Sequence, residues 1–267
     1  MPPGASTATP LQAASGYGPA VLGLPAGVTA CLFDLDGVLT QTAKVHAAAW
    51  EQMFDAYLRR RAGERGEPFT PFDAVSDYDE YVDGRPRYDG VRTFLAARGI
   101  ELPGGSPSDP PAADTVAGLG NRKNEIMLAM IREHGVEPYE GSVRYVRACQ
   151  QAGRARAVVS SSTNCREVLH AAGIDGLFDE VVDGVVAERD HLAGKPAPDT
   201  FLAAAGALDA QPAEAAVFED ALAGVQAGRA GRFGFVVGVD RVGQAQALRA
   251  HGADVVVSDL SELLRAP

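Results

Sequence analysis

The sequence predicts an α/β protein in which a mostly parallel sheet carries one inserted helical segment. Three observations support this fold class. A short apolar run ends in paired acidic residues near position 34, a stretch with helical pieces and no clear strand covers about 62–138, and helices and strands alternate from about 139 onward. Alternation of this kind is typical of parallel sheets that are covered by helices on both faces.

The expected elements follow from local composition and periodicity. Residues 28–35 form an apolar, β-branched run that predicts a buried strand, and residues 43–61 have helical periodicity. Within the insertion, helices are expected at 88–97 and 121–134. The alternating region predicts helices at 142–151, 165–172, 198–207, 221–230 and 243–251, and strands at 155–160, 180–182, 215–218, 233–237 and 254–257.

The domain organisation follows from the position of the first expected strand, which the helical insertion separates from its sheet partners. A compact sheet would place such an insertion outside itself as a lid. We therefore expect a core domain from residues 28–41 and 139–267, with a helical cap domain from 42–138. Residues 1–27 are rich in Ala, Pro, Gly and Ser and carry no charged side chain, which predicts a mobile tail.

Composition limits the possible partners and compartment. The 267 residues are 46% hydrophobic and 22% charged, and the net charge of -11 argues against broad attraction to nucleic acid or anionic lipid. No signal peptide or membrane span is expected. The three cysteines, Cys31, Cys149 and Cys165, are odd in number and favour buried thiols in a reducing compartment. We expect a cytoplasmic monomer or small homo-oligomer.

Asp34 and Asp36 follow the first expected strand, one residue apart. Residues i and i+2 of a strand share a face, so both carboxylates should project beyond its carboxyl end, where open α/β sheets bind ligands. Gly37 then permits a tight turn. Two adjacent anions need a cation, and Mg²⁺ fits carboxylate and carbonyl oxygens completed by a phosphate. Taken alone, the Asp-x-Asp-Gly pattern fits an ordinary turn after a strand equally well.

A serine-rich turn follows the next expected strand of the alternating region. The Ser160 hydroxyl and the N–H groups of Ser161 and Ser162 are candidates for holding phosphate oxygens near a helix N-terminus. A helix cap without any ligand is the alternative interpretation of the same residues.

Two further polar segments lie near the ends of expected strands. Lys195 lies between Gly194 and Pro196 in a rigid turn that can aim its ammonium group inward, although a lone Gly-Lys-Pro also fits a surface loop. Glu219 and Asp220 end a strand. Asp220 is therefore a candidate direct ligand of Mg²⁺, and Glu219 a candidate ligand through water.

Taken in order, these four segments resemble the four motifs of the haloacid dehalogenase (HAD) superfamily of phosphotransferases, and the resemblance covers nearly everything after about residue 28. It implies a Rossmann-like core with an inserted α-helical cap. It also implies that Asp34 is a nucleophile that forms an aspartyl-phosphate and that Lys195 neutralises the crowded oxygens. Asp36 would protonate the leaving oxygen, and its backbone carbonyl would bind Mg²⁺.

The insertion resembles the cap of the β-phosphoglucomutase-like group within that superfamily. The resemblance lies in residues 83–90 and 120–124. It implies that Arg87 grips the phosphate remote from the reaction, although Arg85 is close enough to be the ligand instead. The remaining implied substrate or cap-closure residues are Thr42, His46, Trp50, Gly84 and Lys123.

Three of these assignments have a structural alternative. Trp50 fits a core aromatic, His46 a helix-surface residue and Lys123 a solvated charge. From the core, Ser162 and Asn164 are candidates to complete the remote-phosphate site. Thr163 departs from a lysine found at that place in some mutases, which removes one cation.

These residues lead to two enzyme hypotheses. The first is a Mg²⁺-dependent phosphotransferase acting on a small sugar phosphate, most specifically converting β-glucose 1-phosphate to glucose 6-phosphate. The second is a sugar-phosphate phosphatase, in which water reaches the aspartyl-phosphate. A non-catalytic binding protein is a third hypothesis, but it predicts the loss of an essential charge, and Asp34, Asp36, Lys195 and Asp220 are all present.

Overall fold

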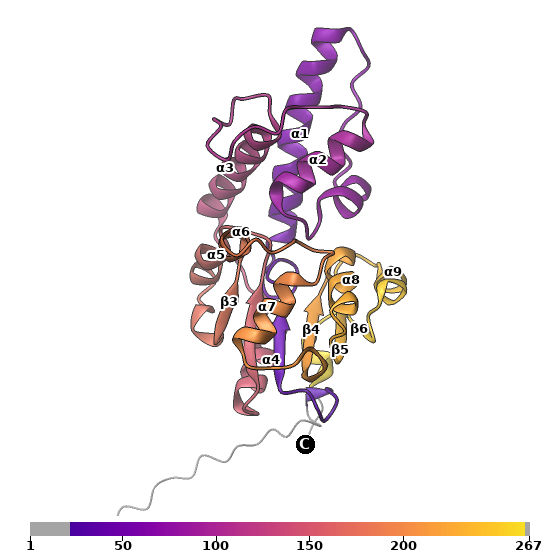
Figure 1. Ribbon diagram of the computed structural model, residues 1–267. Helices are drawn as coiled ribbons and strands as arrows, with labels where there is room; N and C mark the ends of the chain where they lie inside the picture. The colour runs from indigo at the N-terminus through magenta and orange to yellow at the C-terminus, as the bar shows by residue number, and fades with distance from the viewer. Residues whose placement is uncertain (1–21, 265–267) are drawn as a thin grey trace, which may run out of the picture.

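The computed structural model describes residues 22–264, which form a parallel sheet with a helical segment standing over one end of it (Figure 1). The strand order is β3-β2-β1-β4-β5-β6, and each neighbouring pair is parallel. The predicted α/β class is therefore confirmed. The strands are β1 Ala30–Phe33, β2 Ala155–Val159, β3 Glu180–Val182, β4 Ala215–Glu219, β5 Phe235–Val239 and β6 Val255–Val257.

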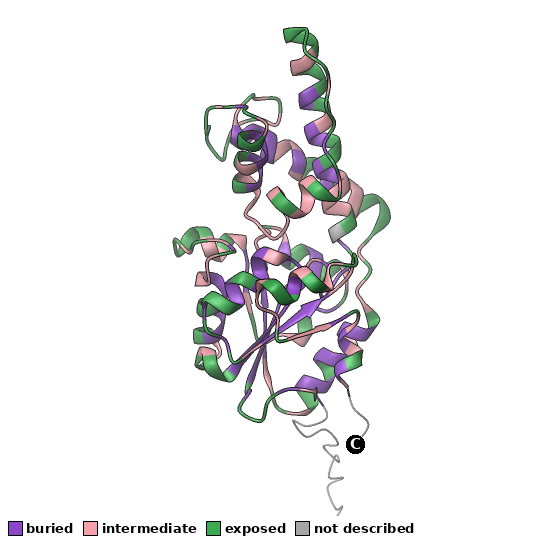
Figure 2. Cartoon of the chain, turned by 90° about the vertical axis from the view of Figure 1, so that its right-hand side faces the viewer, coloured by how far each residue is buried: buried purple, intermediate pink, exposed green. Residues whose placement is uncertain are grey.

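The sheet is buried because helices cover both of its faces (Figure 2). Alternate residues of each strand point to opposite faces, so Cys31 and Phe33 join one apolar cluster while Ala30 and Leu32 join the other. Helices α4 (Glu140–Gln151) and α5 (Cys165–Ala171) contribute to the first cluster. The second cluster contains residues of α7 (Asp199–Ala207), α8 (Leu222–Ala230) and α9 (Ala245–His251).

Residues 43–134, which we call the helical segment, have an apolar cluster of their own. The helical segment contains α1 (Ala43–Arg65), a single π-helical turn η2 (Tyr78–Val82), α2 (Arg87–Ala97) and α3 (Val116–His134). The cluster runs from Trp50 to Leu119 and includes no residue of the sheet. Phe54 lies at its centre, with its ring 4.2 Å from that of Phe94 and 5.3 Å from that of Phe72.

The structure corrects the predicted start of the ordered core. Residues 1–27 were expected to form a tail, but Leu22 is fully buried, Leu24 is 8% exposed, and the Tyr145 hydroxyl donates to the Leu22 carbonyl at 2.9 Å. The packed chain therefore includes residues 22–24, whereas residues 25–27 are exposed. The rest of the predicted tail, residues 1–21, lies outside the described residues.

Element boundaries also differ from the sequence prediction. Helix α3 begins at Val116 rather than near 121, because Thr115 caps it by accepting a hydrogen bond from the Gly118 N–H at 2.9 Å. A short helix, α6 (Gly184–Arg189), was not predicted. Asp183 caps it by accepting hydrogen bonds from the N–H groups of Val185 and Val186. Within residues 22–264, no helix combines the length and apolarity needed to cross a bilayer.

Candidate active site

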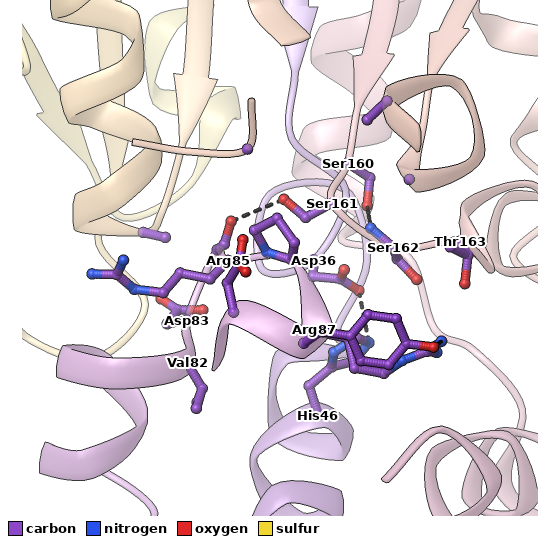
Figure 3. A pocket seen from close by; sticks show the side chains of 18 of the residues that line it. Asp36, His46, Val82, Asp83, Arg85, Arg87, Ser160, Ser161, Ser162 and Thr163 are labelled. Carbon is purple, nitrogen blue, oxygen red and sulfur yellow. Dashed lines mark hydrogen bonds and ion pairs between the residues drawn. The ribbon is translucent and has the colours of Figure 1, made fainter. Parts of the chain in front are cut away.

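The strand order brings the predicted motifs together. Strand β1 lies between β2 and β4, and the carboxyl ends of these three strands lead into Asp34, Ser160 and Asp220 respectively. A cavity of about 580 Å³ opens where these strand ends meet the helical segment (Figure 3). The predicted site residues that line it are Asp34, Asp36, His46, Trp50, Gly84, Arg85, Arg87, Lys123, Ser160, Ser161, Ser162 and Asp220.

Four other predicted residues are close by but do not line the cavity: Thr42, Asn164, Lys195 and Glu219. Lys195 is 2% exposed, and its Nζ lies 2.5 Å from Asp34 Oδ1 and 2.6 Å from Glu219 Oε1. It also donates to the Val159 carbonyl at 3.2 Å. Burial alone would lower the pKa of Lys195, but the two carboxylates outweigh it and raise the pKa, so the side chain stays charged beside Asp34.

The acidic residues at the strand ends form a possible cation site. One carboxylate oxygen from each of Asp34, Glu219 and Asp220 lies within 4.8 Å of the others. Burial, with the neighbouring carboxylates, holds the pKa of Asp34 and of Asp220 well above the usual range. An all-oxygen donor set carrying unbalanced negative charge fits Mg²⁺.

Gly37 makes this cluster possible. Its φ of 82° lies in the left-handed region, and a Cβ at this position would be 1.7 Å from Asp220 Oδ2. Glu219 is held by Lys195 and by the Ala221 N–H, which donates to its Oε2 at 3.1 Å. Asp220 is therefore the freer of the two carboxylates to face a cation.

The Asp36 carboxylate is directed toward the helical segment. Thr42 donates a hydrogen bond to Asp36 Oδ1, and His46 Nε2 lies 3.6 Å from the same oxygen. His46 Nδ1 is in turn 3.0 Å from Lys123 Nζ. Burial and the neighbouring Lys123 lower the pKa of His46 to about 4, and burial lowers the pKa of Lys123 to about 7.

These contacts bear on the structural alternatives for three residues of the helical segment. Lys123 is 4% exposed and is therefore not a solvated charge, and His46 faces Asp36 rather than solvent. Trp50 belongs to the aromatic core, with its ring 5.2 Å from that of Phe54, yet it also lines the cavity. Its ring lies 5.1 Å from Lys123 Nζ.

The serine turn, which contains Ser160, Ser161 and Ser162, forms hydrogen bonds within itself and to the helical segment. The Ser162 N–H donates to Ser160 Oγ at 3.1 Å, a bond that Figure 3 marks with a dashed line, so part of the turn is held by its own hydroxyls. The next helix, α5, begins after Asn164 without a side-chain cap, so the Ser160 hydroxyl does not cap it. Ser161 Oγ donates to the Gly84 carbonyl at 2.9 Å. Asn164 Nδ2 donates to Asn124 Oδ1 at 2.7 Å. These last two bonds join the sheet to the helical segment across the cavity.

Arg85 and Arg87 both line the cavity, and the contacts of the Arg87 guanidinium bear on anion binding. The Arg87 guanidinium carbon lies 5.0 Å from the centre of the Tyr88 ring, and Nη2 is 3.5 Å from Asn121 Oδ1. Arg87 Nε is buried and has no hydrogen-bond partner among residues 22–264. A buried donor without a partner is costly, so an acceptor such as a phosphate oxygen would stabilise it.

Among the lining residues that were not assigned from the sequence are three with polar side chains, Tyr78, Asp83 and Asn124, that stand out by their position. Burial, followed by the charge of Glu219, raises the pKa of Asp83 to about 7. Asp83 and Asn124 are neighbours of assigned residues, so adjacency could have indicated them. Tyr78 lies in a π-helical turn, for which the sequence carries no simple signal.

Comparison with known proteins agrees with this geometry. The haloacid dehalogenase-like hydrolase family matches residues 28–232. The β-phosphoglucomutase of Mycobacterium bovis is 59% identical over 247 residues, which cover 91% of this chain and 94% of that protein. Validoxylamine A 7'-phosphate phosphatase of Streptomyces hygroscopicus subsp. limoneus is 29% identical over 240 residues, covering 87% and 94%.

A solved structure has the same overall arrangement. The β-phosphoglucomutase from Clostridium difficile aligns with a TM-score of 0.68 and 25% identity, over 88% of this chain and 93% of that one. With the family match, these similarities confirm the resemblance expected from the four motifs. The chain is therefore an enzyme of the haloacid dehalogenase-like hydrolase family, similar to its β-phosphoglucomutases.

Proposed function

We propose that this enzyme transfers a phosphoryl group on a small sugar phosphate through an aspartyl-phosphate, with Mg²⁺ as cofactor, and that it converts β-glucose 1-phosphate to glucose 6-phosphate. The observation that carries the proposal is the contact between Asp34 and Lys195, 2.5 Å apart within the acidic cluster at the strand ends. The 59% identity to a β-phosphoglucomutase supports the choice of substrate.

Asp34 is the proposed nucleophile because its carboxylate lines the cavity and a buried cation holds it in place. Lys195 offsets the negative charge that gathers when this carboxylate approaches a phosphate dianion. Mg²⁺, held by the carboxylates of Asp34 and Asp220 and the backbone carbonyl of Asp36, would supply further charge neutralisation, with Glu219 acting through water.

Asp36 is the proposed general acid and base. It lines the cavity and follows Asp34 by two positions in the sequence. The Thr42 hydroxyl donates a hydrogen bond to Asp36 Oδ1. Asp36 can give a proton to the leaving sugar oxygen and later remove one from the attacking hydroxyl. His46 faces Asp36 as a neutral ring, because its pKa is lowered to about 4 by burial and by Lys123. The ring therefore adds no charge of its own when Asp36 gains or loses its proton.

The proposed site for the second phosphate of a sugar bisphosphate lies between Arg87 and the serine turn. Arg87 offers a guanidinium Nε without a partner among the described residues. Ser162 lines the same cavity, and Asn164 is tied to the helical segment through Asn124. A bisphosphate intermediate must reverse its orientation between two transfers. A site that binds phosphate at both ends supports that exchange.

A sugar-phosphate phosphatase is the second candidate function. Thr163 lines the cavity where some mutases have a lysine, so one cation for the remote phosphate is lost. The relative that acts as a validoxylamine A 7'-phosphate phosphatase also covers most of this chain. In a phosphatase, water rather than a sugar hydroxyl would attack the aspartyl-phosphate.

The two functions are separated by measuring both products. Purified enzyme is incubated with Mg²⁺, β-glucose 1-phosphate and a sugar bisphosphate primer, and glucose 6-phosphate and free phosphate are followed together. The mutase proposal expects glucose 6-phosphate as the main product. Free phosphate without glucose 6-phosphate would reject the mutase and favour the phosphatase.

As part of the same proposal we place the enzyme in the cytoplasm, where its three free, buried thiols would stay reduced.

A further inference from the structure

Arg241, in the loop between β5 and α9, binds the backbone of the turn that carries Asp36. Its Nε donates to the Gly37 carbonyl at 2.8 Å, and its Nη2 lies 3.5 Å from the Val38 carbonyl. On the far side, Nη1 donates to the Ser258 carbonyl at 2.7 Å. The guanidinium therefore ties the turn to the end of the sheet that carries β6. Its side chain is 14% exposed, so these bonds are largely sheltered from water.

The turn is built on a glycine, the residue with the widest conformational freedom. Gly37 has a φ of 82°, and its own N–H donates to the Thr40 carbonyl at 2.8 Å. Val38 is held a second time, since Ser142 Oγ donates to its carbonyl at 2.7 Å. Gly37 is one residue from Asp36, so any movement of its peptide group is passed to the Asp36 carboxylate. Among residues 22–264, Arg241 is the residue whose side chain donates a hydrogen bond to the Gly37 carbonyl.

The same guanidinium contacts the chain that returns from the helical segment. Its carbon lies 3.5 Å from the centre of the Tyr139 ring, a cation–π contact. The Tyr139 N–H donates to the Leu39 carbonyl at 2.9 Å, and the Gln41 N–H donates to the Glu137 carbonyl at 2.8 Å. The two connections between the sheet and the helical segment thus run side by side, with Arg241 packed against one of them.

We propose that Arg241 is a positioning residue, which fixes the Asp36 turn relative to the paired connections of the helical segment and so holds Asp36 in register with Thr42 and His46. This inference rests on the proposed phosphoryl transfer, in which Asp36 moves the proton. Arg241 itself does not line the cavity, so it acts through the backbone and not through the substrate. Its loss should therefore lower kcat and leave KM nearly unchanged.

Arg156 provides a matched control because it makes the same kinds of bond far from the site. It lies near the start of β2, at the opposite end of the sheet from the cavity, and donates to the Leu177 carbonyl at 2.8 Å and the Arg154 carbonyl at 2.5 Å. It also pairs with Asp179 at 2.7 Å. Arg156→Gln should destabilise the fold about as much as Arg241→Gln without changing the turn.

The kinetic test compares these two variants. Arg241→Gln should lower kcat for β-glucose 1-phosphate by about 10- to 100-fold with KM within about 2-fold of wild type, because a displacement near 1 Å at a reacting group has effects of that size. Arg156→Gln should keep the wild-type kcat at a temperature where both variants are folded. Arg241→Lys keeps the charge but loses the fork that reaches two carbonyls, so it should recover only part of kcat. Equal kcat values for the two glutamine variants, or a rise in KM alone, would overturn the proposal.

A second measurement does not depend on turnover. Amide hydrogen exchange at Gly37, Gln41 and Tyr139 should be faster in Arg241→Gln than in wild type, and unchanged in Arg156→Gln, because these three N–H groups bond within the turn and the paired connections. Unchanged exchange in Arg241→Gln would reject the positioning role. If wild-type enzyme turns over no sugar phosphate, the proposed function is wrong, and the exchange rates alone decide the role of Arg241.

Discussion

Lys195 and Asp34 are 161 positions apart in the chain, yet Lys195 Nζ and Asp34 Oδ1 are 2.5 Å apart in the folded protein. Both side chains are buried, and Glu219 Oε1 forms an ion pair with the same ammonium group at 2.6 Å. Removing one partner of a buried ion pair leaves an uncompensated charge, which is more costly than the pair itself. This contact therefore links the stability of the fold to the charge of the proposed nucleophile.

Asp34→Asn should abolish turnover and leave the fold intact. The amide is nearly the same size as the carboxylate but cannot attack phosphorus as an anion. The measurement is product formation from β-glucose 1-phosphate, with circular dichroism and thermal unfolding as checks of structure. Activity near the wild-type level would show that another group attacks.

Lys195→Met should destabilise the metal-free protein by about 3 to 5 kcal/mol near neutral pH, because Asp34 and Glu219 lose their cation. The double variant Lys195→Met/Glu219→Gln should recover part of that loss, since one unpaired carboxylate is removed. Urea unfolding of the four proteins in this double-mutant cycle measures the coupling. Additive effects of the two substitutions would mean that the pair is not coupled.

Lys123→Met should change how stability depends on pH. The folded-state pKa of Lys123 is lowered from 10.5 to about 7 by burial, so between these values the unfolded chain binds the proton and the folded chain does not. Its contribution to stability therefore rises with pH across this window and is most unfavourable below about pH 7. The variant should be more stable than wild type by about 1 to 4 kcal/mol near pH 6, and the difference should shrink toward pH 10. A difference independent of pH would contradict the burial of a charged Lys123.

Addition of Mg²⁺ should raise the unfolding temperature more at about pH 8 than at about pH 6. The pKa values of Asp34 and Asp220 are raised by burial and by neighbouring carboxylates, so protons compete with the cation at lower pH. Asp220→Asn should remove most of the shift. The control is Asp209→Asn, because Asp209 is exposed, lies outside the cluster and has a positive φ that asparagine tolerates. A shift that is the same in Asp220→Asn and wild type would place the cation elsewhere.

Arg87→Lys should raise KM for the sugar phosphate more than Arg85→Lys does. Arg87 has the buried donor without a partner among residues 22–264, and a lysine cannot offer two parallel N–H groups to a phosphate. We expect a rise of about 10-fold or more for Arg87→Lys, equivalent to roughly 1.4 kcal/mol. The reverse order of the two variants would make Arg85 the phosphate ligand.

The sheet and the meeting of the four motifs could be predicted from the sequence because both depend on local patterns. Apolar runs between helical patterns give parallel strands, and the carboxyl ends of neighbouring strands lie at one edge, so Asp34, Ser160 and Asp220 had to come close. The role of Lys195 as an internal cation depended on the family resemblance, since its loop alone fits a surface turn equally well.

Other features depend on tertiary contacts that no local pattern specifies. Leu22 lies in a segment whose composition resembles a tail, and only its contact with Tyr145 orders it. Tyr78 reaches the cavity through a π-helical turn, and Arg241 contacts Gly37 across 204 positions of sequence. Such contacts decide how the site is held, whereas the motifs decide which groups it contains.

The central claim is that Asp34 carries the phosphoryl group during turnover. Enzyme with Mg²⁺ is mixed with β-glucose 1-phosphate labelled in its phosphate, quenched in acid during turnover, digested, and analysed by mass spectrometry. The account predicts a hydroxylamine-sensitive acyl phosphate on the peptide that contains Asp34, and none in Asp34→Asn. Turnover with no label on Asp34, or with the label on another residue, would contradict it.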